Sequence, residues 1–359
     1  MFARSFLIKS IVVFGNLYFS LTLKKGLDIK KVKKILVIQQ GGIGDVVSSI
    51  PVYEVLKKKT NARVDTLVGE WSAEILEGNP YIDNIIRVEN ETFFSKNIFR
   101  WLPIISEIRK ERYDMAIILD LFFKPFLAYL CKIPIRAGID QHGEGFALTL
   151  KYKQRISPPQ HYSKIYSGIL SKVGFVWHGK PKIYVNGARK KTKIVGIAPG
   201  GGKNPGAETK VKIWPLKKFA KLGDILIKKY KMKILLFGDK NDLEIAKKIK
   251  GLMKSRVEDL TGKTSIREAA SLIRQCNLFI ANDSALMHIS AAVGTPTVAI
   301  FGPTNPKKLA PEGVKYAWHA DINYFDLNKL DEYNYEQGIG GIKVEEVLNL
   351  CKKAIRNKK

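Results

Sequence analysis

Residues 278–303, LFIANDSALMHISAAVGTPTVAIFGP, contain the pattern that decides the fold. An apolar run over 278–283 is followed by a helical stretch over 284–294 and by a second apolar run over 297–303. Because a helix connects the two runs, they can pair in parallel within one sheet. Runs that are apolar throughout are typical of parallel strands whose sheet is covered by helices on both faces. The segment therefore predicts a doubly wound α/β domain.

The same alternation of strand and helix patterns extends through most of the chain. Buried strands are also expected over 33–40, 63–69, 83–88, 113–121, 135–140 and 233–238, and 194–202 is expected to be a strand that leads into a glycine-rich loop. Helical patterns lie between them, and Ser265 with Glu268 forms a capping-box pattern that opens one of these helices. The repeated alternation predicts parallel sheets throughout, which is an α/β fold class.

The domain boundary is expected in the polar and basic stretch over 184–193, after which the strand pattern restarts. We predict two Rossmann-like domains, 29–187 and 188–359, whose strand carboxyl ends face a shared central cleft. Ligands of doubly wound sheets bind at those ends.

Composition limits the classes of protein to consider. The chain has 359 residues, 61 lysines and arginines and 33 aspartates and glutamates, which gives a net charge of +28. Its three cysteines are odd in number and form no C-x-x-C motif, which excludes a disulfide framework and a cysteine-rich zinc site. The charge favours an anionic partner, and the alternative is a lysine-rich surface that only contacts water. No nucleic-acid-binding motif is evident, so nucleic acid is not an expected partner.

The first 28 residues are predicted to be a separate membrane-associating segment. The longest uncharged run, 10–23, has 14 residues, and about 20 are needed to cross a bilayer. On a helix the polar side chains form one narrow stripe, which consists of Ser5, Lys9, Asn16, Ser20 and Lys24. This pattern favours an amphipathic helix lying in the membrane interface. The alternatives are a helix packed on the protein's own body or on a partner, and a single span.

The first segment that could carry chemistry is Q-Q-G-G-I-G-D at 39–45. Gly42 and Gly44 lie between a strand and a helix, where backbone N–H groups can approach a ligand closely. Asp45 falls in the first turn of that helix. The alternative role for Asp45 is that of a carboxylate that complements the helix dipole.

Three further segments lie in the second half. Gly200, Gly201 and Gly202 belong to P-G-G-G-K-N-P-G at 199–206, a loop that suits a diphosphate or is only a flexible surface loop. N-D-S-A-L-M-H at 282–288 starts a helix, where free N–H groups favour anions, although it could be only a helix cap with a buried histidine. F-G-P-T-N-P at 301–306 alone indicates no more than a turn. The sequence contains no convincing D-x-D pair and no H-x-x-x-H, so no metal is expected.

Taken together, these segments resemble the family 9 glycosyltransferases, the heptosyltransferases that build the inner core of lipopolysaccharide. The order is G-x-G-D, then K-x-W-P, then D-S-x-x-x-H-x-x-A-A-x-G-x-P-x-x-x-x-F-G-P-T, and it extends from about residue 33 to residue 311. The resemblance implies a GT-B fold, with the acceptor on the first domain and the nucleotide-sugar donor on the second. It also implies a last helix, expected over 343–356, that returns to the first domain.

The resemblance also implies roles for individual residues. Asp45 matches the catalytic base, beside an acceptor-side loop with Gly42 and Gly44, and Lys212 matches the lysine that contacts the donor diphosphate. The segment around the donor phosphates and sugar is matched by Asp283, Ser284, Ala285 and His288, together with the loop of Gly200, Gly201 and Gly202. Asp242 and Thr264 lie where the family contacts the nucleoside. Ala285 and Ile213 stand where glycine and arginine are usual, which affects the expected donor sugar more than the reaction class.

The expected function is thus an inverting, metal-independent transfer of a sugar, heptose from ADP-heptose, to a lipopolysaccharide-core or related anionic glycolipid. No cofactor is expected, because the nucleotide-sugar is a substrate. We expect a monomer on the inner face of the cytoplasmic membrane. The alternatives are a nucleotide-sugar epimerase of the same fold, which would convert free donor alone, and a non-catalytic polyanion-binding protein.

Overall fold

The computed structural model describes residues 14, 15, 17 and 29–356, except 40, 94, 96, 121–123, 142, 155–159, 178, 186–192, 203–209 and 320–332. The predicted amphipathic segment 1–28 therefore lies almost entirely outside the described residues. None of the helices in the described part of the chain combines the length and the hydropathy that a membrane span needs. The chain divides into two compact units, Met1–Gly179 and Lys180–Lys359.

The first unit contains a parallel six-stranded sheet with the order β3-β2-β1-β4-β5-β6. Its strands are β1 (Lys34–Ile38), β2 (Arg63–Gly69), β3 (Asn84–Val88), β4 (Met115–Ile118), β5 (Ile135–Asp140) and β6 (Leu150–Lys153). The connecting α-helices are α2 (Ile43–Lys59), α3 (Glu70–Ala73), α4 (Asn90–Phe93), α5 (Leu102–Glu111), α6 (Lys124–Leu130) and α7 (Tyr162–Lys172). All five strands that were expected in this unit are confirmed. The sixth strand, β6, was not indicated by the sequence pattern.

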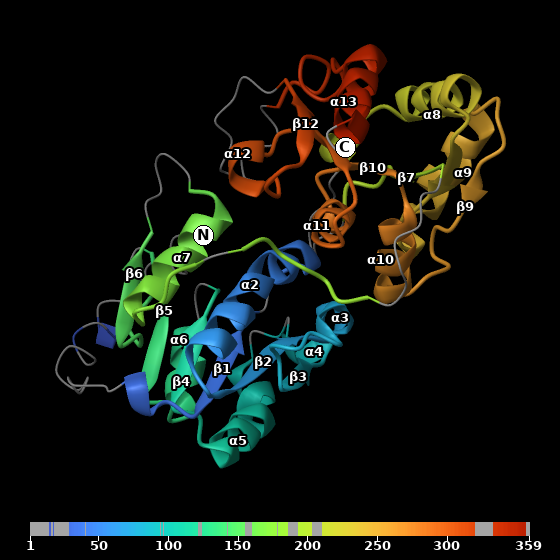
Figure 1. The fold of residues 1–359 in the computed structure, drawn as a ribbon. Coiled ribbons are helices and arrows are strands. Elements are labelled where there is room, and N and C mark those ends of the chain that lie inside the picture. The colour runs from blue at the N-terminus through green and yellow to red at the C-terminus, as the bar shows by residue number, and fades with distance from the viewer. Residues whose placement is uncertain are drawn as a thin grey trace. The chain divides into compact units, whose positions relative to one another are not determined.

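Helices cover this sheet on both faces, as the apolar strands require (Figure 1). Leu36 and Ile38 of β1 belong to a core cluster with residues of α5 and α6. Ile35 and Val37, which alternate with them and are also fully buried, point to the opposite face. Helices α2 and α7 pack together, and α7 also packs on β5 and β6. The continuous apolar run is thus explained by burial on both sides.

The second unit repeats this architecture with the order β12-β11-β10-β7-β8-β9, all parallel. Its strands are β7 (Ile194–Ala198), β8 (Lys233–Leu236), β9 (Glu258–Asp259), β10 (Leu278–Asn282), β11 (Thr297–Phe301) and β12 (Lys315–Trp318). Its α-helices are α8 (Leu216–Tyr230), α9 (Leu243–Leu252), α10 (Ile266–Gln275), α11 (Ala285–Ala292), α12 (Pro306–Leu309) and α13 (Val344–Arg356). The predicted capping box is confirmed, since Ser265 Oγ accepts from the Glu268 N–H at 3.2 Å and Glu268 Oε2 accepts from the Ser265 N–H at 2.8 Å.

The helices of the second unit also form two layers. Residues of α8, α9 and α13 share one apolar core cluster with the strands, while α11 packs on β10 and β11 and contacts α10 (Figure 1). The last helix, expected over 343–356, is α13, and it packs against β10, β11, β12 and α8 within its own unit. Its return to the first unit, which the family resemblance implies, stays a prediction.

The observed division between the units lies at Gly179, whereas the boundary expected at 187/188 falls among residues outside the described part. Residues 183–185, which precede the expected boundary, are hydrogen-bonded to the second unit. The Ile183 N–H donates to the Ala292 carbonyl, and the side chains of Arg267 and Arg274 donate to the carbonyls of Tyr184 and Val185. The start of the expected linker is therefore packed structure that is hydrogen-bonded to side chains of α10, directly after a residue that bonds to the last carbonyl of α11.

Both sheets have a switch point, where successive connections leave in opposite directions. In the first sheet it lies between β1 and β4, and in the second between β7 and β10. Doubly wound sheets bind ligands at the carboxyl ends of the strands at this point. The segments after these four strands are thus the places to look for a site in each unit.

Candidate functional site

The loop after β1 holds Asp45 at the start of α2. Asp45 is exposed, and its Oδ2 accepts a hydrogen bond from the N–H of Gly42, the N-cap residue, at 3.0 Å. A Cβ at Gly41 would lie 2.6 Å from the Asp45 Cβ, so only glycine allows this approach. Gly44 lies in the same first turn, where its carbonyl accepts from Ser48 Oγ at 2.7 Å. The predicted residues of this segment are thus brought together, with the carboxylate both capping the helix and open to solvent.

Gln39 and Tyr166, which were not predicted to belong to the site, fix this loop through hydrogen bonds. Gln39 is buried, and its Nε2 donates to the Asp45 carbonyl and to Tyr166 Oη, each at 3.2 Å. Burial raises the pKa of Tyr166 well above its usual value, and the negative charges of Asp45 and Asp120 add to the rise. Tyr166 comes from α7, so the loop after β1 is fixed by a side chain far away in sequence. No local pattern could have revealed that pairing.

On the other side of the switch point, helix α6, which follows β4, begins with Lys124. Its ammonium lies 4.7 Å from the centre of the Trp101 ring, a cation–π distance. Burial lowers the pKa of Lys124 to about 8, although the charge of Asp120 opposes the change. The first unit thus places carboxylates and a partly desolvated lysine around the carboxyl ends of β1 and β4.

In the second unit, the glycine loop follows β7. Gly202 has φ +72°, a backbone conformation that favours glycine, and a Cβ placed there would lie 3.7 Å from the Ser284 Cβ. At Gly200 a Cβ would lie 2.3 Å from Asp242 Oδ1, so the loop also passes tightly over that carboxylate. Gly201 is buried between them. The structure therefore brings the predicted glycines beside the start of α11.

Asn282, which was quoted in the sequence motif but given no role, connects three segments of this site. Its side chain is fully buried at the end of β10. The Nδ2 donates to the carbonyls of Pro199 and Gly200 at 2.7 and 3.3 Å, and the Oδ1 accepts from the Trp214 N–H at 3.3 Å. One amide thus fixes the glycine loop and the K-x-W-P segment against the strand that leads to Asp283.

Lys212 is positioned by the buried tryptophan two residues after it. Trp214 is fully buried, packs edge-on against Phe219 and donates from Nε1 to the Ile342 carbonyl at 3.0 Å. This anchor holds the short 3-10 turn Lys210–Lys212 close to the end of β10. The Lys212 ammonium then lies 2.9 Å from Asp283 Oδ2.

Asp283 is the centre of a small charged cluster. The same Oδ2 accepts from Thr304 Oγ1 at 2.8 Å, so residues after β10 and β11 meet the lysine at one oxygen. Burial by itself raises the pKa of Asp283, but the charge and hydrogen bond of Lys212, the bond from Thr304 and the nearby His288 lower it below its usual value. Asp283 is therefore ionised at neutral pH and fixes the direction of the lysine. The threonine was missed because F-G-P-T-N-P alone indicated only a turn.

The start of α11 completes this group. Ser284 is the N-cap residue, yet its side chain makes no capping bond, and its buried Oγ has no hydrogen-bond partner within the described part of the chain. Ala285 begins the helix, and His288 follows one turn later, buried, on the side of Asp283. The first N–H groups of a helix and an uncommitted hydroxyl suit an anionic ligand.

The two residues expected near a nucleoside lie in neighbouring loops. Asp242 Oδ2 accepts from the Asp239 N–H at 3.2 Å and so caps a short 3-10 turn, Lys240–Asp242, beside Gly200. Thr264 precedes α10, in a segment that is tied to the end of β8 by the bond from the Gly262 N–H to the Gly238 carbonyl. Their contact with a nucleoside stays a prediction. Among the described residues, no group of three His, Cys, Asp or Glu side chains could hold a metal ion.

Comparisons with known proteins identify the family of this chain. The family model described as glycosyltransferase family 9 (heptosyltransferase) matches residues 101–335, more than half of the chain. Lipooligosaccharide heptosyltransferase 2 of Haemophilus influenzae is 29% identical over 300 residues, which cover 77% of this chain and 85% of that protein. Lipopolysaccharide heptosyltransferase 3 of Escherichia coli is 28% identical over 280 residues, 73% of this chain and 81% of that one.

Solved structures show the same fold. A family 9 glycosyl transferase from Veillonella parvula aligns with a TM-score of 0.79 and 24% identity over 93% of this chain and 99% of its own. The ADP-heptose lps heptosyltransferase II of E. coli aligns with a TM-score of 0.72 and 22% identity over 90% and 99% of the two chains. The two Rossmann-like units are those of a GT-B enzyme, as predicted. The chain belongs to glycosyltransferase family 9 and is a glycosyltransferase.

Proposed function

We propose that this enzyme transfers a heptose from ADP-heptose, with inversion and without a metal ion, to the inner core of lipopolysaccharide or a related anionic glycolipid. The observation that carries the proposal is the pair of unlike groups at the two switch points. An exposed carboxylate, Asp45, follows β1 of one sheet, and a lysine fixed by Asp283 lies beside a glycine loop in the other. The names of the relatives support the substrate class.

Asp45 would accept the proton of an acceptor hydroxyl as the oxygen forms a bond to the anomeric carbon. The attack comes from the face opposite the diphosphate, so the bond to the diphosphate breaks as the new bond forms and the configuration inverts. General-base catalysis of this kind contributes typically about 10²- to 10⁴-fold. Asp45 suits the role because it is exposed at the edge of the sheet where ligands bind.

The leaving diphosphate gains negative charge as its bond to the sugar breaks. Lys212, the backbone N–H groups around Gly201 and the start of α11 at Ser284 would stabilise that charge. These groups are fixed before the substrate arrives, because Asn282 and Asp283 hold the segments that carry them. A cationic side chain and helix N–H groups can thus supply the stabilisation that a metal ion provides in other transferases.

We also propose that the enzyme acts as a monomer at the inner surface of the cytoplasmic membrane. Phe14 and Leu17, which are helical, are 70% and 60% exposed, whereas a Cβ at Gly15 would lie 2.8 Å from the Phe146 ring. This part of the N-terminal segment thus lies against the first unit at one side chain and presents apolar side chains to its surroundings. Exposed apolar side chains on a helix beside basic residues favour interfacial binding.

The test is to supply ADP-, UDP- and GDP-linked sugars, including ADP-heptose, with lipopolysaccharide from a heptose-deficient strain. The proposal predicts transfer from ADP-heptose that EDTA does not reduce, and a product whose anomeric configuration, by NMR, is opposite to that of the donor. Conversion of the free donor without an acceptor would favour the epimerase alternative. Three outcomes would each contradict one part of the proposal: preference for a donor with a nucleotide base other than adenine, retention of the anomeric configuration, or full inhibition by EDTA.

A further inference from the structure

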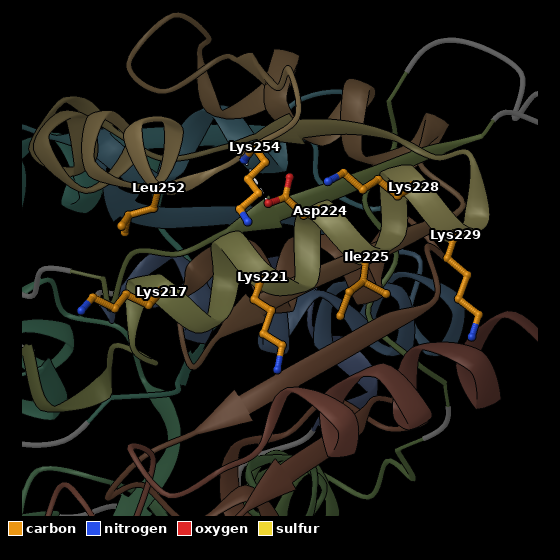
Figure 2. A pocket seen from close by; sticks show the side chains of 8 residues that line it. All are labelled: Lys217, Lys221, Asp224, Ile225, Lys228, Lys229, Leu252 and Lys254. Carbon is orange, nitrogen blue, oxygen red and sulfur yellow. Dashed lines mark hydrogen bonds between the residues drawn. The ribbon is translucent and has the colours of Figure 1, made fainter.

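A groove on the second unit is lined by lysines that the site described above does not use (Figure 2). It follows α8 and reaches the end of α9, and its volume is about 560 Å³. Five of its lining residues are lysines, namely Lys217, Lys221, Lys228, Lys229 and Lys254. Lys217, Lys221 and Lys228 are four and seven residues apart, the spacing that places side chains on one side of a helix.

The groove has little negative charge to balance these lysines. Its one acidic lining residue, Asp224, accepts hydrogen bonds from the backbone N–H groups of Lys254 and Ser255 at 3.0 and 2.8 Å. Lys221 forms an ion pair with Glu345 at 3.3 Å, but both side chains are more than half exposed, so the pair is weak. In the part of the chain that the structure describes, Lys217, Lys229 and Lys254 have no ion-pair partner.

Two lysines just beyond the groove are paired with carboxylates, whereas Lys247 and Lys248 of α9 are exposed and have no ion pair within the described part of the chain. Lys233 pairs with Glu258 at 2.6 Å and Lys250 with Asp259 at 3.3 Å. What distinguishes the groove is that several of its lysines line one concave surface. A concave surface lined by charge of one sign raises the local concentration of a partner of opposite charge.

Two apolar side chains lie among the lysines and indicate the kind of partner. Ile225 and Leu252 line the groove, and Leu252 is 42% exposed. At the boundary between lipid headgroups and acyl chains, a lysine can place its apolar stem along apolar groups while its ammonium group reaches the headgroups. A groove that combines lysines with apolar side chains suits this boundary. Single-stranded nucleic acid is commonly held by aromatic side chains on which bases stack, and the lining residues include none.

We propose that this groove of α8 and α9 is a docking surface for the anionic headgroup layer of a phospholipid bilayer. Each basic residue close to an anionic membrane contributes about fivefold to binding. Several lysines together therefore give a reversible attachment that depends on salt. The proposal rests on the membrane location proposed above and is independent of the transfer chemistry, because the groove shares no residue with the donor or acceptor loops.

The test compares two full-length variants that lose the same charge. One replaces groove lysines (Lys217→Gln, Lys228→Gln, Lys229→Gln and Lys254→Gln), and the other replaces exposed lysines of the first unit (Lys59→Gln, Lys110→Gln, Lys153→Gln and Lys172→Gln). Binding is measured by co-sedimentation with phosphatidylcholine vesicles that contain about one-third phosphatidylglycerol. The groove variant should bind at least about tenfold more weakly than wild type, and the matched variant should bind almost as well.

The difference should disappear on pure phosphatidylcholine vesicles and at about 0.5 M salt, where exposed charges are screened. Both variants should keep wild-type affinity for ADP, a readout that separates the failure of this proposal from the failure of the proposed function. Equal losses in the two variants would overturn the proposal, because they would show a general effect of net charge. Unchanged vesicle binding with reduced binding to single-stranded RNA in the groove variant would overturn it in favour of nucleic acid.

Discussion

In the first sheet, the carboxylate at the switch point is Asp45, which is exposed and accepts a hydrogen bond from the backbone N–H of Gly42. In the second sheet it is Asp283, which is buried and accepts from Lys212 and Thr304 at a single oxygen. Both follow a strand of a parallel sheet with the same order, and both lie near the start of a helix. The two aspartates thus have similar places in their sheets but different surroundings.

Under the proposed function, this difference in environment lets one topology support two kinds of chemistry. A carboxylate that faces solvent can gain and lose a proton during a reaction. One that is buried against a lysine keeps its charge, because protonating it would leave the lysine without its counter-ion. The proposed function accordingly gives proton transfer to the first position and positioning of a cation to the second.

Replacing the exposed carboxylate should have the largest effect on transfer. Asp45→Asn keeps the size of the side chain and an acceptor for the Gly42 N–H, but the amide cannot take up a proton. The transfer rate should fall by about 100-fold or more. The measurement is kcat at saturating donor and acceptor, and wild-type turnover would show that Asp45 is only a helix cap.

Replacing the buried carboxylate should act on stability. Asp283→Asn leaves the Lys212 ammonium, whose side chain is 16% exposed, without its counter-charge, and should lower the free energy of unfolding by about 3 kcal/mol at neutral pH. Urea denaturation of the variant and of wild type measures this difference.

The pH dependence of that difference follows from the lowered pKa. Because the folded protein holds the pKa of Asp283 below its usual value of 3.8, the stabilisation is complete above that value and is lost as the pH falls through the folded-state pKa. The gap between wild type and Asp283→Asn should therefore shrink in acid. A gap that stays constant down to the pH of acid unfolding would contradict the ion pair.

Removing the cation itself should reduce donor binding. Lys212→Ala should weaken the binding of ADP by about 1.5–3 kcal/mol, the range for a hydrogen bond to a charged group. Lys247→Ala, an exposed lysine on α9, is the matched control and should bind ADP as wild type does. Isothermal titration calorimetry checks both, and equal losses would indicate a general effect of charge.

The smallest effect is expected at the threonine that shares the Asp283 oxygen. Thr304→Val keeps the shape but loses the donor, and should weaken ADP binding by about 1 kcal/mol. Thr304→Ser restores the hydroxyl and should recover most of the loss. If valine and serine behave alike, the contact with Asp283 does not contribute to the site.

The strand and helix pattern predicted most of the fold because burial on both faces makes parallel strands apolar throughout. The strands that were missed, β6, β9 and β12, lie at the sheet edges or are two residues long, and they carry polar or half-exposed side chains. At an edge, one side of the strand needs no partner and the apolar pattern weakens. The packed start of the expected linker was missed because its carbonyls accept hydrogen bonds from arginine side chains of α10 that are 83 and 89 residues away in sequence.

The candidate site was predicted where one short segment holds both the loop and the candidate side chain, as at Asp45 or Asp283. It was not predicted where a side chain acts across the fold. Asn282 bonds to backbone groups of segments 68 to 83 residues away, and Gln39 to a tyrosine 127 residues away. Such partners become adjacent only after the sheet has formed, so no spacing within the chain indicates them.

The most direct test of the two roles is the stabilisation that ADP gives to Asp45→Asn and Asp283→Asn, measured by thermal shift with saturating ADP. Ligand binding raises the apparent stability by mass action, so each shift reports how well the donor site is preserved. Asp45→Asn should show the same ADP-induced rise in Tm as wild type, while Asp283→Asn should lose most of it. If Asp45→Asn loses the shift as well, or if Asp283→Asn keeps it in full, the assignment of proton transfer to one carboxylate and cation positioning to the other is wrong.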